Sequence, residues 1–269
     1  MGNLNILVDA DSIFFKVAYG ATSESDLRKK YDSFCRKLEL TVKDKLCNPF
    51  DEDETATTYY AVKGTGNFRK DLYDKYKSNR PNLDQDIRDK LNFLHRYAIT
   101  SGAIPADNME ADDLVCIWAY EAREAEDQYV ICGIDKDLKQ IPGNHYNYGK
   151  DTWDFIDDDT GHYNLMLQCL TGDNTDGIPG LKGIGPKKAE KILKDTPKER
   201  RWNRVKAAWR GHGGNLKQLE VSYKLLRMLT SWEELNDIRT HLSGEAAIGK
   251  QHDVPQQSDK AEAVHRLSE

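Results

Sequence analysis

Short apolar runs alternate with amphipathic segments over the first half of the chain. Residues 4–9, 57–63 and 129–134 are rich in apolar, β-branched and aromatic side chains, which predicts three strands. Residues 26–46 and 83–98 carry apolar side chains at helical spacing. Strands that alternate with helices predict an α/β fold, in which a mainly parallel twisted sheet has helices on both faces.

The pattern changes in the second half. A helix is expected from about Glu110, with Asn108 as its N-cap. From about residue 163 onward, helical segments are separated by Gly/Pro turns and no strand is predicted. Residues 244–269 are polar and lack aromatic residues, which predicts a flexible tail. We therefore expect an α/β core over residues 1–162, a helical subdomain over 163–243 and a tail over 244–269.

Composition excludes several classes of protein. No apolar run approaches the roughly 18 residues that a membrane span requires, so no membrane contact is expected. The five cysteines form no C-x-x-C pair, which argues against a disulfide framework and a zinc site. We expect a cytoplasmic protein.

Charge is unevenly distributed. The net charge of −6 would disfavour binding to nucleic acid if it were evenly spread. However, residues 182–210 contain eleven basic and three acidic side chains, a net of +8, and residues 63–80 contain six and two, a net of +4. A solvated helix face is the commoner cause of any single basic run. Two such stretches beside dense acidic groups instead indicate a surface that binds a polyanion.

Acidic residues recur in four short groups near the ends of predicted elements. The groups are Asp9-Ala-Asp11, Glu110-Ala-Asp112-Asp113, Asp135-Lys-Asp137 and Asp173-Asn-Thr-Asp176. Two carboxylates about 4 Å apart repel by about 4 kcal/mol at an effective dielectric near 20, so a shared cleft needs cations. Mg²⁺ and Mn²⁺ prefer such oxygen ligands. Any one group is better explained as a helix N-terminus or a turn, but four in succession favour a metal site.

A glycine-rich turn follows the last acidic group. Gly177, Gly180, Gly183 and Gly185 let the backbone approach a ligand and present N–H groups to phosphate. The following helix starts at Pro186 and places Lys187, Lys191 and Lys194 on one face. No Gly-Lys-Ser/Thr is present, so a nucleotide-binding P-loop is excluded. The segment predicts a clamp for a DNA backbone.

Taken together, these motifs resemble the 5′-nuclease or flap-endonuclease family, most of all its bacteriophage exonuclease members. Val-Asp-Ala-Asp11, Glu-Ala-Asp-Asp113, Ile-Asp-Lys-Asp137 and Gly-Asp-x-x-Asp-Gly177 occur in family order. The resemblance implies a PIN-like core, a helical arch over about residues 64–100 and a helix-three-turn-helix in the C-terminal subdomain.

The resemblance also implies roles for individual residues. A first Mg²⁺ or Mn²⁺ ion would be held by Asp9, Glu110 and Asp112, and a second would be held or supported by Asp113, Asp135, Asp137, Asp173 and Asp176. Asp9 and Glu110 would be catalytic together with Lys77 and Arg80, which would contact the scissile phosphate. DNA contacts are implied for Lys16, for Tyr76 (stacking on a terminal base), and for Gly183, Gly185, Lys187, Lys188 and Lys191. A K⁺ ion is implied at the glycine turn 177–185.

One departure from the family pattern bears on the first metal. Ala61-Val62-Lys63 offers no aspartate at the end of the second predicted strand, and Asp11 is the candidate replacement. The expected activity is hydrolysis of DNA at 5′ ends, flaps or nicks, extending to RNA/DNA hybrids, by a monomer in the cytoplasm (the host cytoplasm if a phage encodes it). A degenerate member that binds branched DNA with weak or no cleavage is one alternative. A PIN-type ribonuclease is another, although such domains lack the glycine turn and the basic block.

Overall fold

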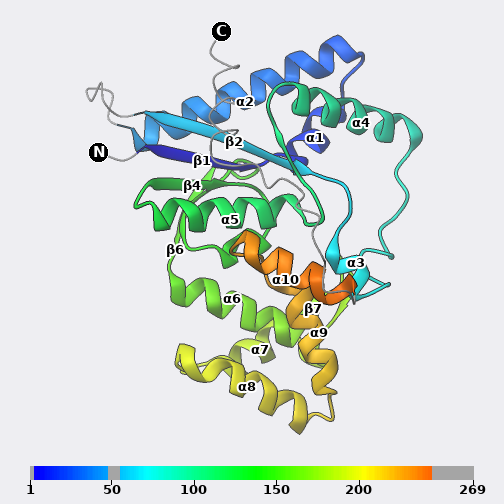
Figure 1. Cartoon of the computed structure of the whole chain (residues 1–269), viewed down its shortest axis with the longest axis vertical. Helices are drawn as coiled ribbons and strands as arrows, with labels where there is room; N and C mark the ends of the chain where they lie inside the picture. Colours follow the sequence, from blue (N-terminus) through cyan, green and yellow to red (C-terminus); the bar gives the residue numbers. More distant parts are fainter. Residues whose placement is uncertain (1–2, 48–54, 244–269) are drawn as a thin grey trace.

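A six-stranded sheet runs through the upper half of the molecule in Figure 1. The structure is a computed structural model that describes residues 3–47 and 55–243. The strand order is β3-β2-β1-β4-β5-β6, and neighbours are parallel except for β6, which is antiparallel to β5. The strands are β1 (Leu4–Asp9), β2 (Ala56–Lys63), β3 (Ile104–Ala106), β4 (Gln128–Cys132), β5 (Gly143–Asn147) and β6 (Thr152–Ile156). The predicted mainly parallel sheet is confirmed.

Helices cover both faces of the sheet, as the pattern predicts. Alternate residues of a strand face opposite sides. In β1, Ile6 and Val8 join one core and Leu7 joins the other. The first core packs against α1 (Asp11–Ala18), α2 (Glu24–Leu46) and α4 (Gln85–Thr100), and the second packs against α5 (Ala111–Glu124), on the opposite side in Figure 1.

A helical lobe with its own core follows the sheet. It contains α6 (Asp158–Thr171), α7 (Pro186–Leu193), α8 (Lys198–Gly211) and α9 (Leu216–Leu226) around buried residues that include Leu170 and Trp209. The helical lobe is not confined to the expected range of residues 163–243. Its core also includes Tyr76 from the first half of the chain. The helix α10 (Trp232–Ser243) returns to the α/β part, where Leu235 joins the core beneath α5 (Figure 1).

Several boundaries differ from the predictions for local physical reasons. The N-cap of α5 is Glu110 rather than Asn108, because Glu110 has extended backbone and Asp113 accepts its N–H, whereas Asn108 has a φ of 63°. The helix α6 begins at Asp158, where Asp157 caps it by accepting the Thr160 N–H.

Five strands were not predicted. β3 is too short for a periodic signal, β5 has a polar composition and β6 has only five residues. The region expected to lack strands contains the short pair β7 (Gly172–Asp173) and β8 (Ile178–Pro179). These two strands close a loop around the last acidic group.

The segment expected to form an arch contains two helices. The first, α3 (Phe68–Leu72), packs against α9 and α10, and α4 packs against α1 and α2. The turn between them lies at the edge of the helical lobe (Figure 1). The predicted tail over 244–269 lies outside the described residues.

Candidate active site

Acidic residues gather where the parallel strands β1 and β4 end. Asp9 is the last residue of β1, which lies between β2 and β4. Gly133 follows β4, and a Cβ atom there would lie 2.1 Å from Leu138 Cδ1. Glycine therefore lets the turn that carries Asp135 and Asp137 close against the end of β1.

Asp9 is a buried carboxylate with hydrogen-bond donors but no ion-pair partner within residues 3–47 and 55–243. Its Oδ1 accepts the Asp11 N–H and its Oδ2 accepts the Ser12 hydroxyl, both at 3.3 Å. Burial, followed by the charges of Asp11 and Asp135, raises the pKa of Asp9 to about 7. A cation beside Asp9 would favour its ionised form.

Asp11 lies against the strand that lacks the expected aspartate. Its carboxylate accepts the backbone N–H of Lys63, at the end of β2, with distances of 3.0 and 3.1 Å to its two oxygens. Burial raises the pKa of Asp11, although the Lys63 N–H opposes the rise. Asp11 therefore places a carboxylate at the end of β2 without an acid in β2 itself.

Glu110, at the N-terminus of α5, receives three polar contacts. Asn67 Nδ2 and the Tyr76 hydroxyl each donate to it at 2.9 Å, and Lys77 forms an ion pair with it. Burial raises the pKa of Glu110, but the charges of Lys77 and Arg69 more than offset this, so the net pKa is below its ordinary value. Glu110 is held as an ion.

Asp113 has a structural role, which differs from the expected role in metal binding. Arg69 donates to both carboxylate oxygens, at 2.8 Å for the Nη2–Oδ1 pair. The Leu229 N–H donates to Oδ1 at 3.1 Å and the Glu110 N–H to Oδ2 at 3.0 Å. With both oxygens bonded and the side chain fully buried, Asp113 presents none to a metal ion. Its neighbour Asp112 has no ion pair in the described part of the chain, and burial and then the Glu110 charge raise its pKa well above the ordinary value.

The two remaining acidic groups face each other between β4 and the helical lobe. Lys136 Nζ lies 2.7 Å from Asp173 Oδ2, and this lysine lowers the pKa of Asp173 despite the opposing effect of burial. Burial, followed by the charge of Asp135, raises the pKa of Asp137 to about 6. Gln168 of α6 donates a hydrogen bond to Asp137.

The predicted basic block contacts the same acids. Arg80 Nη2 lies 2.6 Å from Asp176 Oδ1, and Lys77 Nζ lies 3.6 Å from Asp176 Oδ2 in addition to its pairing with Glu110. The backbone reinforces these contacts, because the Lys77 N–H donates to the Asp176 carbonyl at 2.8 Å. Asn79 Nδ2 donates to the Asn174 carbonyl at 2.7 Å. The turn that carries Lys77 is therefore docked on the turn that carries Asp176.

Tyr76 does not occupy the expected position. Its ring is 3% exposed within the core of the helical lobe, so a base cannot stack on it in this structure. Its hydroxyl instead lies 2.9 Å from Glu110 Oε2 and 3.4 Å from Asp176 Oδ2. Tyr76 links two acidic groups.

The acids suit a divalent cation by their chemistry but are not arranged around one. Among the residues the structure describes, no three Asp, Glu, His or Cys side chains lie close enough to bind one ion together. Lysine and arginine neutralise four of the acids instead, namely Glu110, Asp113, Asp173 and Asp176. All candidate ligands are carboxylates, which suit Mg²⁺ or Mn²⁺. Asp9 and Asp112, with raised pKa values and no ion pair among the described residues, show where positive charge is lacking.

The glycine turn that follows Asp176 exposes its backbone. Gly183 has a φ of +78°, and a Cβ atom at Gly183 or Gly185 would meet nothing within 4 Å. Gly185 is the N-cap of α7, whose Lys187, Lys188 and Lys191 are exposed. Lys188 Nζ donates to the Gly183 carbonyl at 2.9 Å. Lys16 is exposed in the last turn of α1.

Two cationic residues at the site, Arg69 and Lys136, were not singled out by sequence. Arg69 falls within the basic stretch 63–80 but is 3% exposed and also donates to the Leu225 and Arg227 carbonyls, at 2.8 and 3.0 Å. Only its position two residues after a candidate N-cap, in Asn67-Phe-Arg69, distinguishes it from surface arginines. Lys136 lies between Asp135 and Asp137, and this position was the feature of the sequence that could have identified it.

Comparisons with known proteins identify the family. The model of the 5′-3′ exonuclease, N-terminal resolvase-like domain, matches residues 5–161, more than half of the chain. The chain is 34% identical over 139 residues to DNA polymerase I of Rhizobium leguminosarum, covering 48% of this chain but only 14% of the polymerase. It is 26% identical over 218 residues to the flap endonuclease Xni of Shewanella baltica, covering 71% of this chain and 74% of Xni.

A solved structure supports the fold. The bacteriophage T5 D15 flap endonuclease, crystallised with DNA and metal ions, superposes with a TM-score of 0.61 at 16% identity and covers 99% of this chain and 98% of its own. Such a likeness concerns the fold. The match to the family model shows that this chain belongs to the 5′-3′ exonuclease family of 5′-nucleases.

Proposed function

We propose that the protein is a structure-dependent 5′-nuclease that hydrolyses DNA phosphodiester bonds at or near 5′ ends and flaps with two divalent metal ions. The observation that carries the proposal is the contact between the basic block and the acids at the sheet edge. Lys77 and Arg80, far from Asp176 in sequence, both pair with it, and Lys77 also pairs with Glu110. Positive groups beside a cluster of metal-type ligands suit a phosphodiester.

The carboxylates divide into two proposed metal sites. Asp9, Glu110 and Asp112 would hold the first Mg²⁺ or Mn²⁺, with Asp11 in place of the aspartate that β2 lacks. The second would be held by Asp135, Asp137, Asp173 and Asp176. Bound cations would supply water activation and neutralise charge that develops on the phosphate.

The remaining roles belong to side chains that the chain itself positions. Lys77 and Arg80 would leave their acidic partners and donate to the scissile phosphate. Tyr76 and Asp113 would hold Glu110 at the N-terminus of α5. The open backbone at Gly183 and the lysines of α7 would bind duplex phosphates, because a helix N-terminus favours anions.

Finer parts of the proposal follow from the family resemblance. They are a K⁺ ion at residues 177–185, action on RNA/DNA hybrids, and function as a monomer in the cytoplasm. No helix among the described residues has the length and apolar character needed to cross a membrane.

The test is digestion of 5′-labelled nicked and flapped duplexes with Mg²⁺ or Mn²⁺. We expect Lys77→Ala to lower the rate by about 10²–10³-fold, as for loss of a group that stabilises transition-state charge. Asp135→Asn should also lower it, whereas Asp44→Asn, on the exposed side of α2, should not. Full activity of the Asp135→Asn and Lys77→Ala proteins would refute the proposal.

One observation favours a second candidate function. Because β2 ends in Ala61-Val62-Lys63, the first metal site lacks an acid from this strand. A protein that binds flapped DNA without cutting it would show a gel shift and no product in Mn²⁺. Efficient cleavage by the wild-type protein would exclude this candidate.

A further inference from the structure

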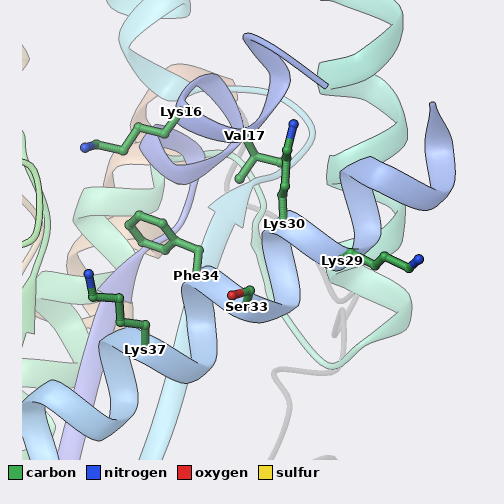
Figure 2. Close-up of a pocket in the computed structure, with 7 residues that line it drawn as sticks. All are labelled: Lys16, Val17, Lys29, Lys30, Ser33, Phe34 and Lys37. Carbon is green, nitrogen blue, oxygen red and sulfur yellow. The ribbon is translucent and has the colours of Figure 1, made fainter. Parts of the chain in front are cut away.

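A basic hollow of about 600 Å³ lies between α1 and α2, outside the acidic cluster. It is lined by Lys16, Val17, Lys29, Lys30, Ser33, Phe34 and Lys37 (Figure 2). No acidic side chain lines it. The hollow therefore combines an apolar floor with positive charge at its rim.

The lysines of the hollow are not equivalent. Lys30 Nζ is engaged by Asp26 at 2.9 Å and by the Gly20 carbonyl at 2.7 Å, and the Lys29 end group points away from the ring in Figure 2. In Figure 2 the Lys16 side chain lies above the Phe34 ring and the Lys37 side chain lies below it. Both are exposed, and neither has an ion pair within the described residues. Two free cations thus flank one aromatic ring.

Two sets of contacts connect the hollow with the acidic cluster. Along α1, Lys16 follows Ser12 by four residues, a rise of about 6 Å, and Ser12 donates to Asp9. Through the core, the Phe34 ring contacts Tyr148 at 5.3 Å between centroids, and the Tyr148 hydroxyl donates to the Asp9 carbonyl at 2.8 Å. Both sets of contacts place the hollow beside the elements that hold Asp9.

We propose that this hollow binds an unpaired nucleic-acid strand that leaves the active site, with a base on Phe34 and phosphates on Lys16 and Lys37. The proposal rests on the proposed nuclease function and adds a contact for the single strand. Aromatic rings that stack bases between lysines that contact the backbone are the general means of binding single strands. A rigid duplex would not place one base flat on a ring at the floor of a hollow.

The test is fluorescence anisotropy in EDTA, so that no cleavage occurs, with a nicked duplex and the same duplex carrying a 5′ or a 3′ single-stranded flap. Lys37→Ala should weaken binding of at least one flapped duplex about threefold or more and reduce its salt slope by about 0.7, the value for one phosphate of a single strand. Phe34→Leu should weaken the same complex about tenfold, because stacking contributes about 1–3 kcal/mol per base. Neither change should alter binding of the nicked duplex.

Matched controls separate this proposal from the general function. Lys45→Ala removes the same charge from an exposed position on α2 outside the hollow and should leave all affinities unchanged. Lys187→Ala on α7 should weaken binding of the nicked and the flapped duplexes equally. If only this result fails, the proposed duplex clamp is contradicted and the proposal for the hollow is not. If Phe34→Leu lowers the unfolding temperature, Lys37→Ala decides the question.

Two results would overturn the proposal. One is unchanged flap binding in the Lys37→Ala protein, or an equal loss for the nicked and the flapped duplexes. The other is that tripolyphosphate abolishes the extra affinity for the flapped duplex, while a folded Phe34→Leu protein binds that duplex as the wild type does. That outcome would make the hollow a site for small anions.

Discussion

At the scale of single residues, Asp9 shows the energetic conflict in this site most directly. It is 6% exposed, accepts two hydrogen bonds and has no cation beside it among the described residues. A rise in pKa from 3.8 to about 7 corresponds to about 4 kcal/mol, at roughly 1.4 kcal/mol for each tenfold change in proton affinity. The ionised carboxylate therefore destabilises the metal-free fold.

This destabilisation depends on pH in a defined direction. The folded state holds the Asp9 proton more tightly than the unfolded state, so stability from this group is present near pH 4 and is lost as the pH rises to 7. We expect Asp9→Asn to raise the free energy of unfolding at pH 8 by up to about 4 kcal/mol, and by much less at pH 5. Urea denaturation in EDTA at the two pH values measures the difference.

Asp44→Asn is the control, because it removes a carboxylate from an exposed position. Added Mg²⁺ should stabilise the wild-type protein at pH 8 more than the Asp9→Asn protein. An Asn variant that is less stable than wild type at pH 8 would contradict the expectation.

Arg69 illustrates how far residue type alone can mislead. It contributes to the +4 charge of residues 63–80, which sequence reasoning assigned to a polyanion-binding surface. The structure buries it, and it joins α3, Asp113 and the carbonyls of Leu225 and Arg227. An internal arginine cannot be told from a surface one by local sequence, since its partners lie 44 to 158 residues away.

At the scale of elements, the β7–β8 pair explains two of the glycines. Gly172 has a φ of +68°, and a Cβ atom there would lie 2.3 Å from the Gly180 nitrogen. The close approach brings Asp173 and Asp176 to the acidic cluster, where Asp173 Oδ1 accepts the Asp176 N–H at 3.2 Å. The glycine-rich composition thus serves a tight strand pair as well as an exposed backbone.

We expect Gly172→Ala to lower the free energy of unfolding by about 2–4 kcal/mol, from backbone strain and overpacking. Cleavage should fall with it, because Asp173 and Asp176 would shift. Gly211→Ala is the matched control, since it ends α8 with nothing within 4 Å of an added Cβ, and it should be neutral or stabilise by about 0.5–1 kcal/mol. Equal stabilities of the two variants in urea denaturation would show that the strand pair does not constrain Gly172.

Among elements, the sequence predicted the long ones. The periodic helices and the strands β1, β2 and β4 were anticipated because each satisfies its own hydrogen bonds or buries a continuous apolar run. β3, β5, β6, β7 and β8 were missed. They are short or polar, and they exist as strands only because neighbouring strands supply their hydrogen bonds.

At the scale of the whole molecule, the chain passes twice between the α/β part and the helical lobe. Tyr76 packs in the lobe, and Leu235 of α10 packs back beneath α5. Arg69 joins both parts from within, through Asp113 and the Leu225 carbonyl. The site lies at this junction, so its geometry depends on both parts being folded together.

Leu235→Ala tests this dependence. Leu235 is 4% exposed, and its truncation should cost about 2–5 kcal/mol of unfolding free energy. Leu242→Ala on the same helix, at 38% exposure, should cost less than about 1 kcal/mol. Both are measured by urea denaturation followed by tryptophan fluorescence, and a single cooperative transition is expected. Separate transitions for the lobe and the core in the wild-type protein would show that α10 does not couple them.

The sequence by itself determined the α/β class, the acidic groups at the ends of strands and the glycine turn before a basic helix, because these depend on local periodicity and residue chemistry. Only the tertiary structure decided how the acids are used. It buried Asp113 against Arg69, withdrew the Tyr76 ring into a core and paired Lys77 with Glu110. It also placed Phe34 between two free lysines beside α1. Such pairings depend on burial and on contacts between residues distant in sequence. In the buried interior the low dielectric strengthens these contacts, so the free energy depends strongly on which partner is present.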